Sequence, residues 1–337
     1  VVNLPHDYSI EQPYDSANPA QNGFLPGGTG WYRRRLSWPG TPAGRHVFIR
    51  FDGVYMNSEV WINGHALGTR PNGYLGFTYE LTPFLKRGDN VLAVRVDNSR
   101  VPSARWYTGS GIYRHVWLVS TGAVRVAYSG TFVTTPSVST SRATIDLEAT
   151  LENLGAAGAR AEVTTTLVDA AGKVHASGKV SRVLEPGTTR VAQTFTLTDP
   201  ALWSPAAPRM YSLRSAVSVD GKVTDTYVTP LGVRSLRFDP DSGFFLNGAP
   251  MKFQGVCDHQ DISPVGIAVP EDMLHARLVM LKQMGCNAIR TSHNPRSPEF
   301  YNMCDTMGFL VMDEVFDGWD HAKARWDYGN YWDAWWK

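Results

Sequence analysis

The sequence predicts a multidomain protein: an all-β jelly-roll sandwich, then an immunoglobulin-like β-sandwich, then the first βα units of a (β/α)8 TIM barrel. Three observations carry this prediction. The length of 337 residues allows two or three domains. Short strand-like runs separated by turn residues fill the chain up to about residue 233, and strands alternate with helices after it. We therefore expect domains at 1–120, 121–233 and 234–337.

The first segment, 1–120, has the pattern of a jelly roll. Asn63-Gly64 between two apolar runs predicts a hairpin, because these residues accept the positive φ angles of a type I′ turn. Residues 48–51 (FIRF) and 90–96 (NVLAVRV) alternate as half-buried strands do. Short strands bounded by Gly, Pro and Asn at close intervals favour a sandwich of this type.

The second segment, 121–233, keeps the strand pattern but is poorer in aromatic residues. Turn signals stand at Ala171-Gly172, Glu185-Pro186-Gly187 and Asp220-Gly221. About a hundred residues with several such strands fit an immunoglobulin-like sandwich. The segment has no cysteine pair, so only the architecture is implied, and we expect it to act as a spacer.

The third segment, 234–337, alternates between strand and helix. The pattern predicts strands at 251–256, 288–292 and 309–312. A helix begins at Pro270 and stops at Gly285, and a second is capped by Ser297 and stops at Gly308. Apolar strands joined by helices are typical of a parallel sheet covered by helices.

A complete eightfold barrel takes about 250 residues, and about 100 remain after residue 234. We therefore expect the first three βα units, with five units missing. The chain also opens at Val1 without a signal core and closes on Trp335-Trp336-Lys337, so we expect a piece of a longer protein. The third strand of such a piece would have unpaired backbone groups along one edge, so we expect aggregation or dimerisation. A homo-oligomer is therefore kept as an alternative to a monomer.

Composition excludes several classes of partner. The chain has 32 Lys and Arg against 31 Asp and Glu, a net charge of +1, which argues against nucleic acid or an anionic membrane. No run approaches the roughly 18 apolar residues of a membrane span. Three cysteines (Cys257, Cys286 and Cys304) match no zinc pattern and are interpreted as small buried hydrophobes. We predict no cofactor and no metal.

Polar side chains follow the predicted strands, where barrel enzymes place their active sites. The candidates are Cys257, Asp258, His259, Gln260 and Asp261 after the first strand, His293 and Asn294 after the second, Asp313 and Glu314 after the third, and Asp317, Trp319 and Asp320 beyond. Arg290 lies in mid-strand, and a buried guanidinium needs a partner, for which Asp313 or Glu314 is the natural choice. Some of these polar groups could equally serve only to organise the barrel mouth.

These residues carry a family resemblance. The stretch 287–295 (NAIRTSHNP), with Asp305 and 308–312 (GFLVM), resembles the signature of glycoside hydrolase family 2, although Asn294 stands where that family usually has Tyr. Residues 255–261 (GVCDHQD) resemble its first-strand loop, and 105–114 (RWYTGSGIYR) the end of its sugar-binding jelly roll. Similar stretches stand at 4–8 (LPHDY), 30–33 (GWYR), 202–205 (LWSP) and 312–314 (MDE). Residues 19–23 (PAQNG) resemble the β-galactosidases of this family.

The resemblance implies a retaining glycosidase acting on terminal β-D-galactosides. Such an enzyme needs two carboxylates about 5 Å apart, one as acid/base and one as nucleophile. In the family both glutamates follow later strands, so we expect them beyond Lys337 and expect this chain alone to be inactive. Glu314 with Asp258 is a weak substitute pair, since one of them would need a raised pKa and nothing in the sequence isolates either group from water or partners.

The resemblance also suggests which residues hold the sugar. His293 would contact sugar hydroxyls, Arg105 would reach into the barrel mouth from a jelly-roll loop, and Asn294 and His259 would line the subsite. Each has a structural alternative: Arg105 could stack on Trp106, for example. Other functions stay open as well, namely a β-glucuronidase of the same family or a carbohydrate-binding module without turnover. The few cysteines fit a cytoplasmic, periplasmic or secreted protein alike.

Overall fold

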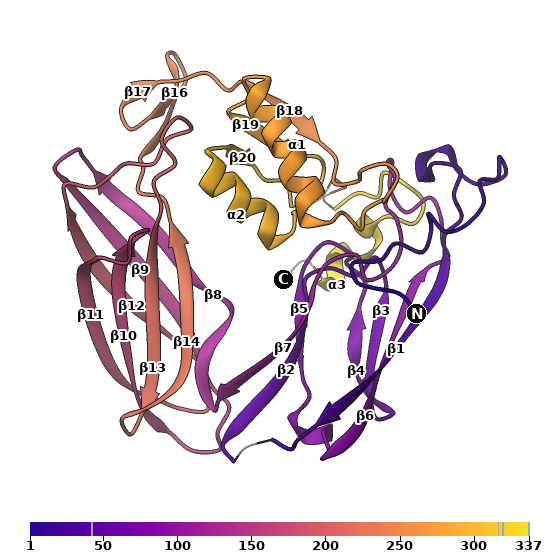
Figure 1. Ribbon diagram of the computed structural model, residues 1–337, viewed down its shortest axis with the longest axis horizontal. Coiled ribbons are helices and arrows are strands. Elements are labelled where there is room, and N and C mark those ends of the chain that lie inside the picture. The colour runs from indigo at the N-terminus through magenta and orange to yellow at the C-terminus, as the bar shows by residue number, and fades with distance from the viewer. Residues whose placement is uncertain (42, 316, 319, 336–337) are drawn as a thin grey trace.

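The computed structural model describes residues 1–41, 43–315, 317–318 and 320–335. Two β-sandwiches stand side by side, and a small α/β unit lies between their upper ends (Figure 1). The predicted fold class is confirmed: the units follow the chain in the expected order. None of the helices in the described part of the chain is long and apolar enough to cross a membrane.

The jelly roll is built from two antiparallel sheets. In spatial order the first contains β1 (Gly28–Trp38), β6 (Gly88–Asn98), β3 (Ser58–Ile62) and β4 (His65–Arg70), and the second β5 (Phe77–Glu80), β2 (Arg45–Phe51) and β7 (Val116–Gly122). The predicted hairpin is present, with φ of 51° at Asn63 and 84° at Gly64. Alternate residues of both sheets meet in one apolar core that includes Val47, Phe51, Ile62 and Val96.

The second sandwich also has two antiparallel sheets. The first contains β11 (Val174–Leu184), β10 (Ala159–Asp169), β13 (Tyr211–Val219) and β14 (Lys222–Leu231), and the second β12 (Gly187–Thr198), β9 (Arg142–Asn153) and β8 (Val124–Val138). Every second residue of β9 is buried, as expected for a strand with one face on the core. Trp203 is 1% exposed, and its Nε1 donates to the Asp305 carbonyl of the α/β unit at 2.7 Å. This sandwich is therefore joined directly to the third unit.

The third unit begins with a small antiparallel sheet and continues as a parallel one. The antiparallel sheet contains β15 (Leu236–Asp239), β16 (Gly243–Leu246) and β17 (Ala249–Pro250). The parallel sheet has the order β18 (Gly255–Asp258), β19 (Ala288–Thr291) and β20 (Leu310–Met312). The first predicted strand, 251–256, is placed too early, because the Met251 amide bonds back to the Phe244 carbonyl of the preceding hairpin.

Two helices cover the parallel sheet. Helix α1 (Glu271–Gln283) follows Pro270, and its first turn carries Glu271 and Asp272 at the positive end of the helix dipole. Helix α2 (Pro298–Met307) is capped by Ser297, which accepts a hydrogen bond from the Phe300 amide, and ends at Gly308 with φ of 77°. Both helices pack on the sheet through the apolar cluster Leu278, Cys286, Ile289, Phe300, Cys304 and Phe309.

Short helices complete the described chain. They are 3₁₀ turns at Ala20–Asn22, Thr82–Phe84 and Tyr328–Tyr331, and α3 (Trp332–Trp335).

The prediction of three buried cysteines is wrong for one of them. Cys286 and Cys304 are buried, whereas Cys257 is exposed, because it lies on the edge strand β18 of the parallel sheet.

Candidate functional site

The parallel strands bring the predicted polar residues to one edge of the sheet. Asp258 ends β18, His293 and Asn294 follow β19, and Asp313 and Glu314 follow β20. Since the three strands run in the same direction, their carboxyl ends meet on the same side. This edge also faces the jelly-roll loop that precedes β7.

Glu314 organises the centre of this edge. Its Oε2 lies 3.0 Å from Nδ1 of His293, and its Oε1 accepts a hydrogen bond from Nε of Arg290 at 2.7 Å. Of the two partners expected for Arg290, the structure selects Glu314. The expectation of a buried guanidinium is wrong: the Arg290 side chain is 37% exposed, because it lies on the face of β19 opposite Ile289, away from the two helices that cover the sheet. Arg290 thus holds the Glu314 carboxylate in place, and Glu314 in turn fixes the orientation of His293.

The other carboxylate after β20, Asp313, has a structural role. Its Oδ1 accepts hydrogen bonds from the Tyr301 hydroxyl at 2.6 Å and the Thr291 hydroxyl at 3.0 Å. The Thr291 hydroxyl also accepts from the Glu314 amide at 2.9 Å. These contacts join the ends of β19 and β20 to helix α2 and hold Glu314 beside His293.

A tryptophan from the jelly roll completes the site. The ring centroid of Trp106 lies 5.0 Å from that of His293 and 6.0 Å from that of His259, and the two histidines are 5.4 Å apart. Its Nε1 donates to the Tyr74 hydroxyl at 3.2 Å, which fixes the ring. Sequence reasoning had treated Trp106 only as a stacking partner for Arg105. Two features of the sequence pointed to a site role for Trp106. It lies in the 105–114 stretch, and aromatic faces pack on sugars.

The surroundings of His259 favour its neutral form. Burial lowers its pKa, and the nearby His293 and Arg296 act in the same direction against the opposing effects of Asp261 and Asp258. A neutral imidazole has one N–H donor and one acceptor nitrogen. It can therefore both donate to and accept from hydroxyl groups.

Arg105 lies at this edge but is held by an acid. Its Nε donates to Oδ2 of Asp317 at 2.9 Å and its Nη2 to Oδ1 at 2.6 Å, and Lys323 also reaches Oδ1 at 3.1 Å. Burial raises the pKa of Asp317, but the hydrogen bonds from Arg105 and Lys323 outweigh it and the net shift is downward. Arg105 is thus paired across the domain boundary, an arrangement that neither sequence alternative, sugar contact or stacking, had anticipated.

Asn294 is placed behind the aromatic rings. It is 1% exposed, and neither its amide nitrogen nor its amide oxygen has a hydrogen-bond partner among the described residues. It lines a cavity of about 30 Å³ together with Tyr55, Trp106 and Asp317. Burying an amide without hydrogen-bond partners costs free energy. The Asn294 amide is therefore free to hydrogen-bond with a polar ligand or with water.

The weak substitute pair, Asp258 and Glu314, is not an acid/base pair in the structure. Asp258 is held by Arg277 at 3.0 Å and by Arg296 at 3.4 Å, on the helix side of the sheet. Glu314 is held by Arg290 and His293. Of the remaining candidates, Asp320 pairs with His321 on the surface, and Trp319 lies outside the described residues.

Arg114 fixes the jelly roll against the strand ends. The residue is 6% exposed and its guanidinium donates four hydrogen bonds. Within the jelly roll it reaches the carbonyls of Asp52 at 3.2 Å and Tyr74 at 2.7 Å. Across the boundary it reaches Oε1 of Gln260 at 3.2 Å and the Pro295 carbonyl at 2.7 Å. Arg114 therefore connects the jelly roll to the loops after β18 and β19.

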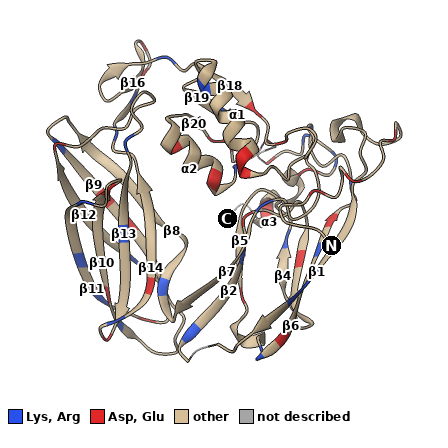
Figure 2. Ribbon diagram, viewed as in Figure 1, with Lys and Arg blue, Asp and Glu red and all other residues tan. Residues whose placement is uncertain are grey.

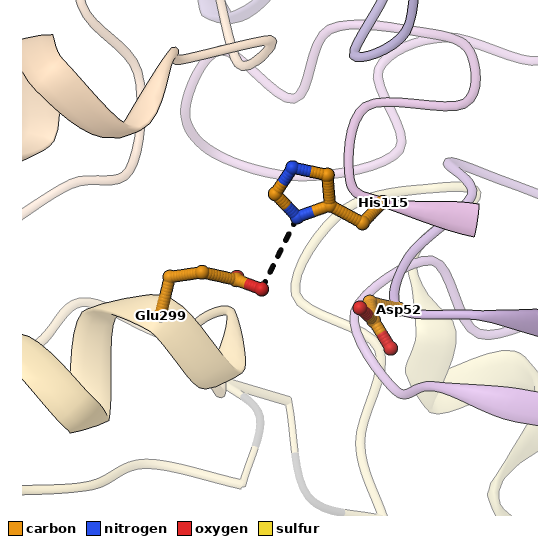
Figure 3. Close-up of side chains that lie close together, drawn as sticks. All are labelled: Asp52, His115 and Glu299. Atoms are coloured by element: carbon orange, nitrogen blue, oxygen red, sulfur yellow. Dashed lines mark hydrogen bonds and ion pairs between the residues drawn. The ribbon is translucent and has the colours of Figure 1, made fainter. Parts of the chain in front are cut away.

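A second contact between these units involves a histidine and acids (Figure 3). Nδ1 of His115 lies 3.1 Å from Oε1 of Glu299, and its Nε2 lies 3.5 Å from Glu271. Asp52 is beside them, and the potential ligand atoms of Asp52, His115 and Glu299 lie within 4.8 Å of one another. Asp52 is already engaged by Trp117 at 2.6 Å and Arg50 at 3.1 Å. Protein side chains thus engage this cluster, which joins the start of β7 to the starts of α1 and α2, where acidic residues gather (Figure 2).

The fold and the site together define a class of protein. Two β-sandwiches precede the opening strands of a parallel βα sheet, and a sandwich loop adds an aromatic ring to its polar edge. The chain belongs to glycosyl hydrolase family 2. The family's sugar-binding domain matches residues 8–122, its middle domain residues 124–234, and its TIM barrel domain residues 240–323.

Relatives with known names agree in fold. The chain is 46% identical to the β-galactosidase BoGH2A of Bacteroides ovatus over 99% of its own length and 40% of that protein's. It matches a crystal structure of a β-glycosidase from Bacteroides vulgatus with a TM-score of 0.93 and 46% identity, over 99% of this chain and 43% of the other. A Bacteroides uniformis β-glucuronidase matches with a TM-score of 0.84 and 31% identity, over 93% and 38%. The chain thus spans less than half the length of these relatives.

Proposed function

We propose that the chain forms the sugar-binding side of a retaining β-galactosidase that hydrolyses terminal β-D-galactosides. Three parallel strands supply less than half of an eightfold barrel, so the acid/base and nucleophile glutamates come from later strands of the completed barrel. The substrate is a carbohydrate, and the near-zero net charge gives no reason to expect nucleic acid or a membrane as partner.

One observation carries the proposal: Trp106 of the jelly roll meets His259 and His293 at the ends of the barrel strands. An aromatic face packs on the C–H face of a sugar ring, while the imidazoles offer donors and acceptors to its hydroxyls. We assign His293 to the hydroxyls of the sugar that is cleaved. Asn294, His259 and the ion-paired Arg105 line the same edge.

The test is hydrolysis of an aryl β-D-galactoside by the protein with its barrel complete. The 337-residue chain alone should release no aryl alcohol. His293→Ala in the complete protein should lower kcat/KM by about 10²- to 10³-fold, because hydrogen bonds that tighten in the transition state contribute several kcal/mol. His46→Ala is the matched control, since this histidine also faces a glutamate (Glu80, 2.7 Å) and is similarly exposed, but lies in β2 away from the site. Equal losses in the two variants would contradict the assignment.

The choice of sugar is tested in the same assay. The galactoside is favoured by the 46% identity to the Bacteroides ovatus β-galactosidase, against 40% to a putative β-glucuronidase of Formosa agariphila and 31% to the Bacteroides uniformis β-glucuronidase. We expect kcat/KM for the galactoside to exceed that for the glucuronide. The reverse order would move the proposal to a β-glucuronidase of the same family.

A carbohydrate-binding module without turnover is the second candidate, and the exposed aromatic side chains of the jelly roll favour it: Trp31 is 54% and Trp117 42% exposed. The two functions differ in where the sugar binds. Galactose binding that survives Trp106→Ala in the 337-residue chain would favour the module, whereas loss of binding would favour the site at the strand ends.

A further inference from the structure

The hydrogen-bond partners of His293 decide which of its two ring nitrogens can face a sugar. Nδ1 lies 3.0 Å from Oε2 of Glu314 and 3.3 Å from Nη2 of Arg290. Nε2 has no hydrogen-bond partner among the residues that the structure describes. The protein therefore occupies Nδ1, and Nε2 is the ring nitrogen that is left for a ligand.

The contact with Glu314 also decides where the ring carries its hydrogen. An ionised carboxylate accepts hydrogen bonds and cannot donate them, so the contact of Oε2 with Nδ1 is favourable only if Nδ1 carries a hydrogen. Arg290 does not need the Nδ1 lone pair, because its Nε donates to Oε1 of Glu314 at 2.7 Å and its Nη1 to Sγ of Cys257 at 3.3 Å. The neutral imidazole therefore has its hydrogen on Nδ1 and a free lone pair on Nε2.

Glu314 is held in this position from two sides. Its backbone amide donates to the Thr291 hydroxyl at 2.9 Å, and that hydroxyl donates to Oδ1 of Asp313 at 3.0 Å. On the other side, Arg290 holds Oε1. One carboxylate oxygen is thus committed to Arg290 and the other to His293, so the contact has a defined polarity.

We propose that Glu314 is a positioning residue that makes His293 a hydrogen-bond acceptor toward the sugar. The proposal rests on the proposed function, in which His293 contacts a sugar hydroxyl. Nε2 accepts from that hydroxyl, so the substrate must donate a hydrogen at this position. A free hydroxyl does so, whereas an ether oxygen or a fluorine does not. Through His293, Glu314 selects a sugar that is unsubstituted at the contacted hydroxyl.

The direct test is nitrogen-15 NMR of the histidine rings in the 337-residue chain, recorded over a pH series. The shifts of the two ring nitrogens distinguish the Nδ1–H tautomer, the Nε2–H tautomer and the imidazolium. The His293 signals are those missing from His293→Gln. The neutral ring should be the Nδ1–H tautomer, which is the less common one for histidine in water. An Nε2–H tautomer, or an imidazolium throughout the series, would overturn the proposal without the need for any further variant.

Glu314→Gln should invert the tautomer. Arg290 needs an acceptor, so the amide oxygen stays with Arg290 and the amide nitrogen takes the place of Oε2 and donates to Nδ1 of His293. The ring should then carry its hydrogen on Nε2. Glu80→Gln is the matched control, because Glu80 faces His46 at 2.7 Å in the jelly roll, and it should leave the His293 signals unchanged. An unchanged tautomer in Glu314→Gln would contradict the role of Glu314.

Activity of the protein with its barrel complete measures the consequence for the substrate. Aryl β-D-galactosides with fluorine at position 3, 4 or 6 each lack one donor, and the position that His293 contacts is the one where fluorine costs His293→Ala least. There, fluorine should lower kcat/KM of the wild type at least about tenfold more than that of Glu314→Gln, in which Nε2 is a donor. Equal fluorine effects in the two proteins would overturn the proposal. If the galactoside itself were not hydrolysed, the proposed function would fail instead, and the NMR result would still decide the role of Glu314.

Discussion

The four hydrogen bonds of Arg114 make a sharp prediction about how the jelly roll is held against the barrel unit. Arg114→Met keeps much of the side-chain volume and removes every donor. The bonds to Gln260 and Pro295 cross the domain boundary, whereas those to Asp52 and Tyr74 do not. Of these four bonds, only those to Gln260 and Pro295 resist separation of the jelly roll from the barrel unit.

The size of the effect follows from those two bonds. A hydrogen bond to a charged group contributes about 1.5–3 kcal/mol, so the two together contribute about 3–6 kcal/mol to docking. Removing the guanidinium also removes the cost of burying it, so we expect the lower end of this range. About 3 kcal/mol corresponds to a rise of about 10²-fold in the equilibrium constant for opening the interface.

The Ile267 amide reports on this opening. It is buried and donates to Oδ2 of Asp7 in the jelly roll at 3.1 Å, across the same boundary. Hydrogen exchange at Ile267 should therefore accelerate by about 10²-fold in Arg114→Met. Arg95→Met is the control, because Arg95 pairs with Glu59 and Asp97 inside the jelly roll and leaves the boundary intact.

The refuting result is specific. If exchange at Ile267 changes by less than about threefold in Arg114→Met, then the two cross-boundary bonds do not hold the units together. An equal acceleration in Arg95→Met would show that general loosening of the jelly roll, and not the boundary, is responsible.

Two other groups make further predictions. The lowered pKa of Asp317 means that its contact with Arg105 is complete above the ordinary carboxyl value of 3.8 and is lost as the pH falls through the lower folded-state value. Asp317→Asn should reproduce the acid state at pH 7, measured as faster trypsin cleavage after Lys323; an unchanged rate would refute this. Exposed Cys257 should react first with a thiol reagent, because Cys286 is buried and burial raises the pKa of Cys304 to about 12. Peptide mapping that finds Cys304 labelled first in the folded chain would contradict this order.

The sequence alone determined the elements whose signals are local. The Asn63-Gly64 turn follows from positive φ angles, and the start and end of α2 follow from Ser297, Pro298 and Gly308. The strand-ending residues could also be located, because parallel strands bring their carboxyl ends to one edge. These inferences need only neighbours in the chain, or the known direction of a strand.

Only the tertiary structure decided the partners. Arg105 and Asp317 are 212 residues apart in the chain, and Arg114 and Pro295 are 181 apart, so no local pattern pairs them. The role of Trp106 was likewise hidden, since it depends on where the jelly roll docks. Hydrogen bonds and ring contacts are decided within a few ångströms, and that precision comes from the packing of whole domains rather than from the order of residues.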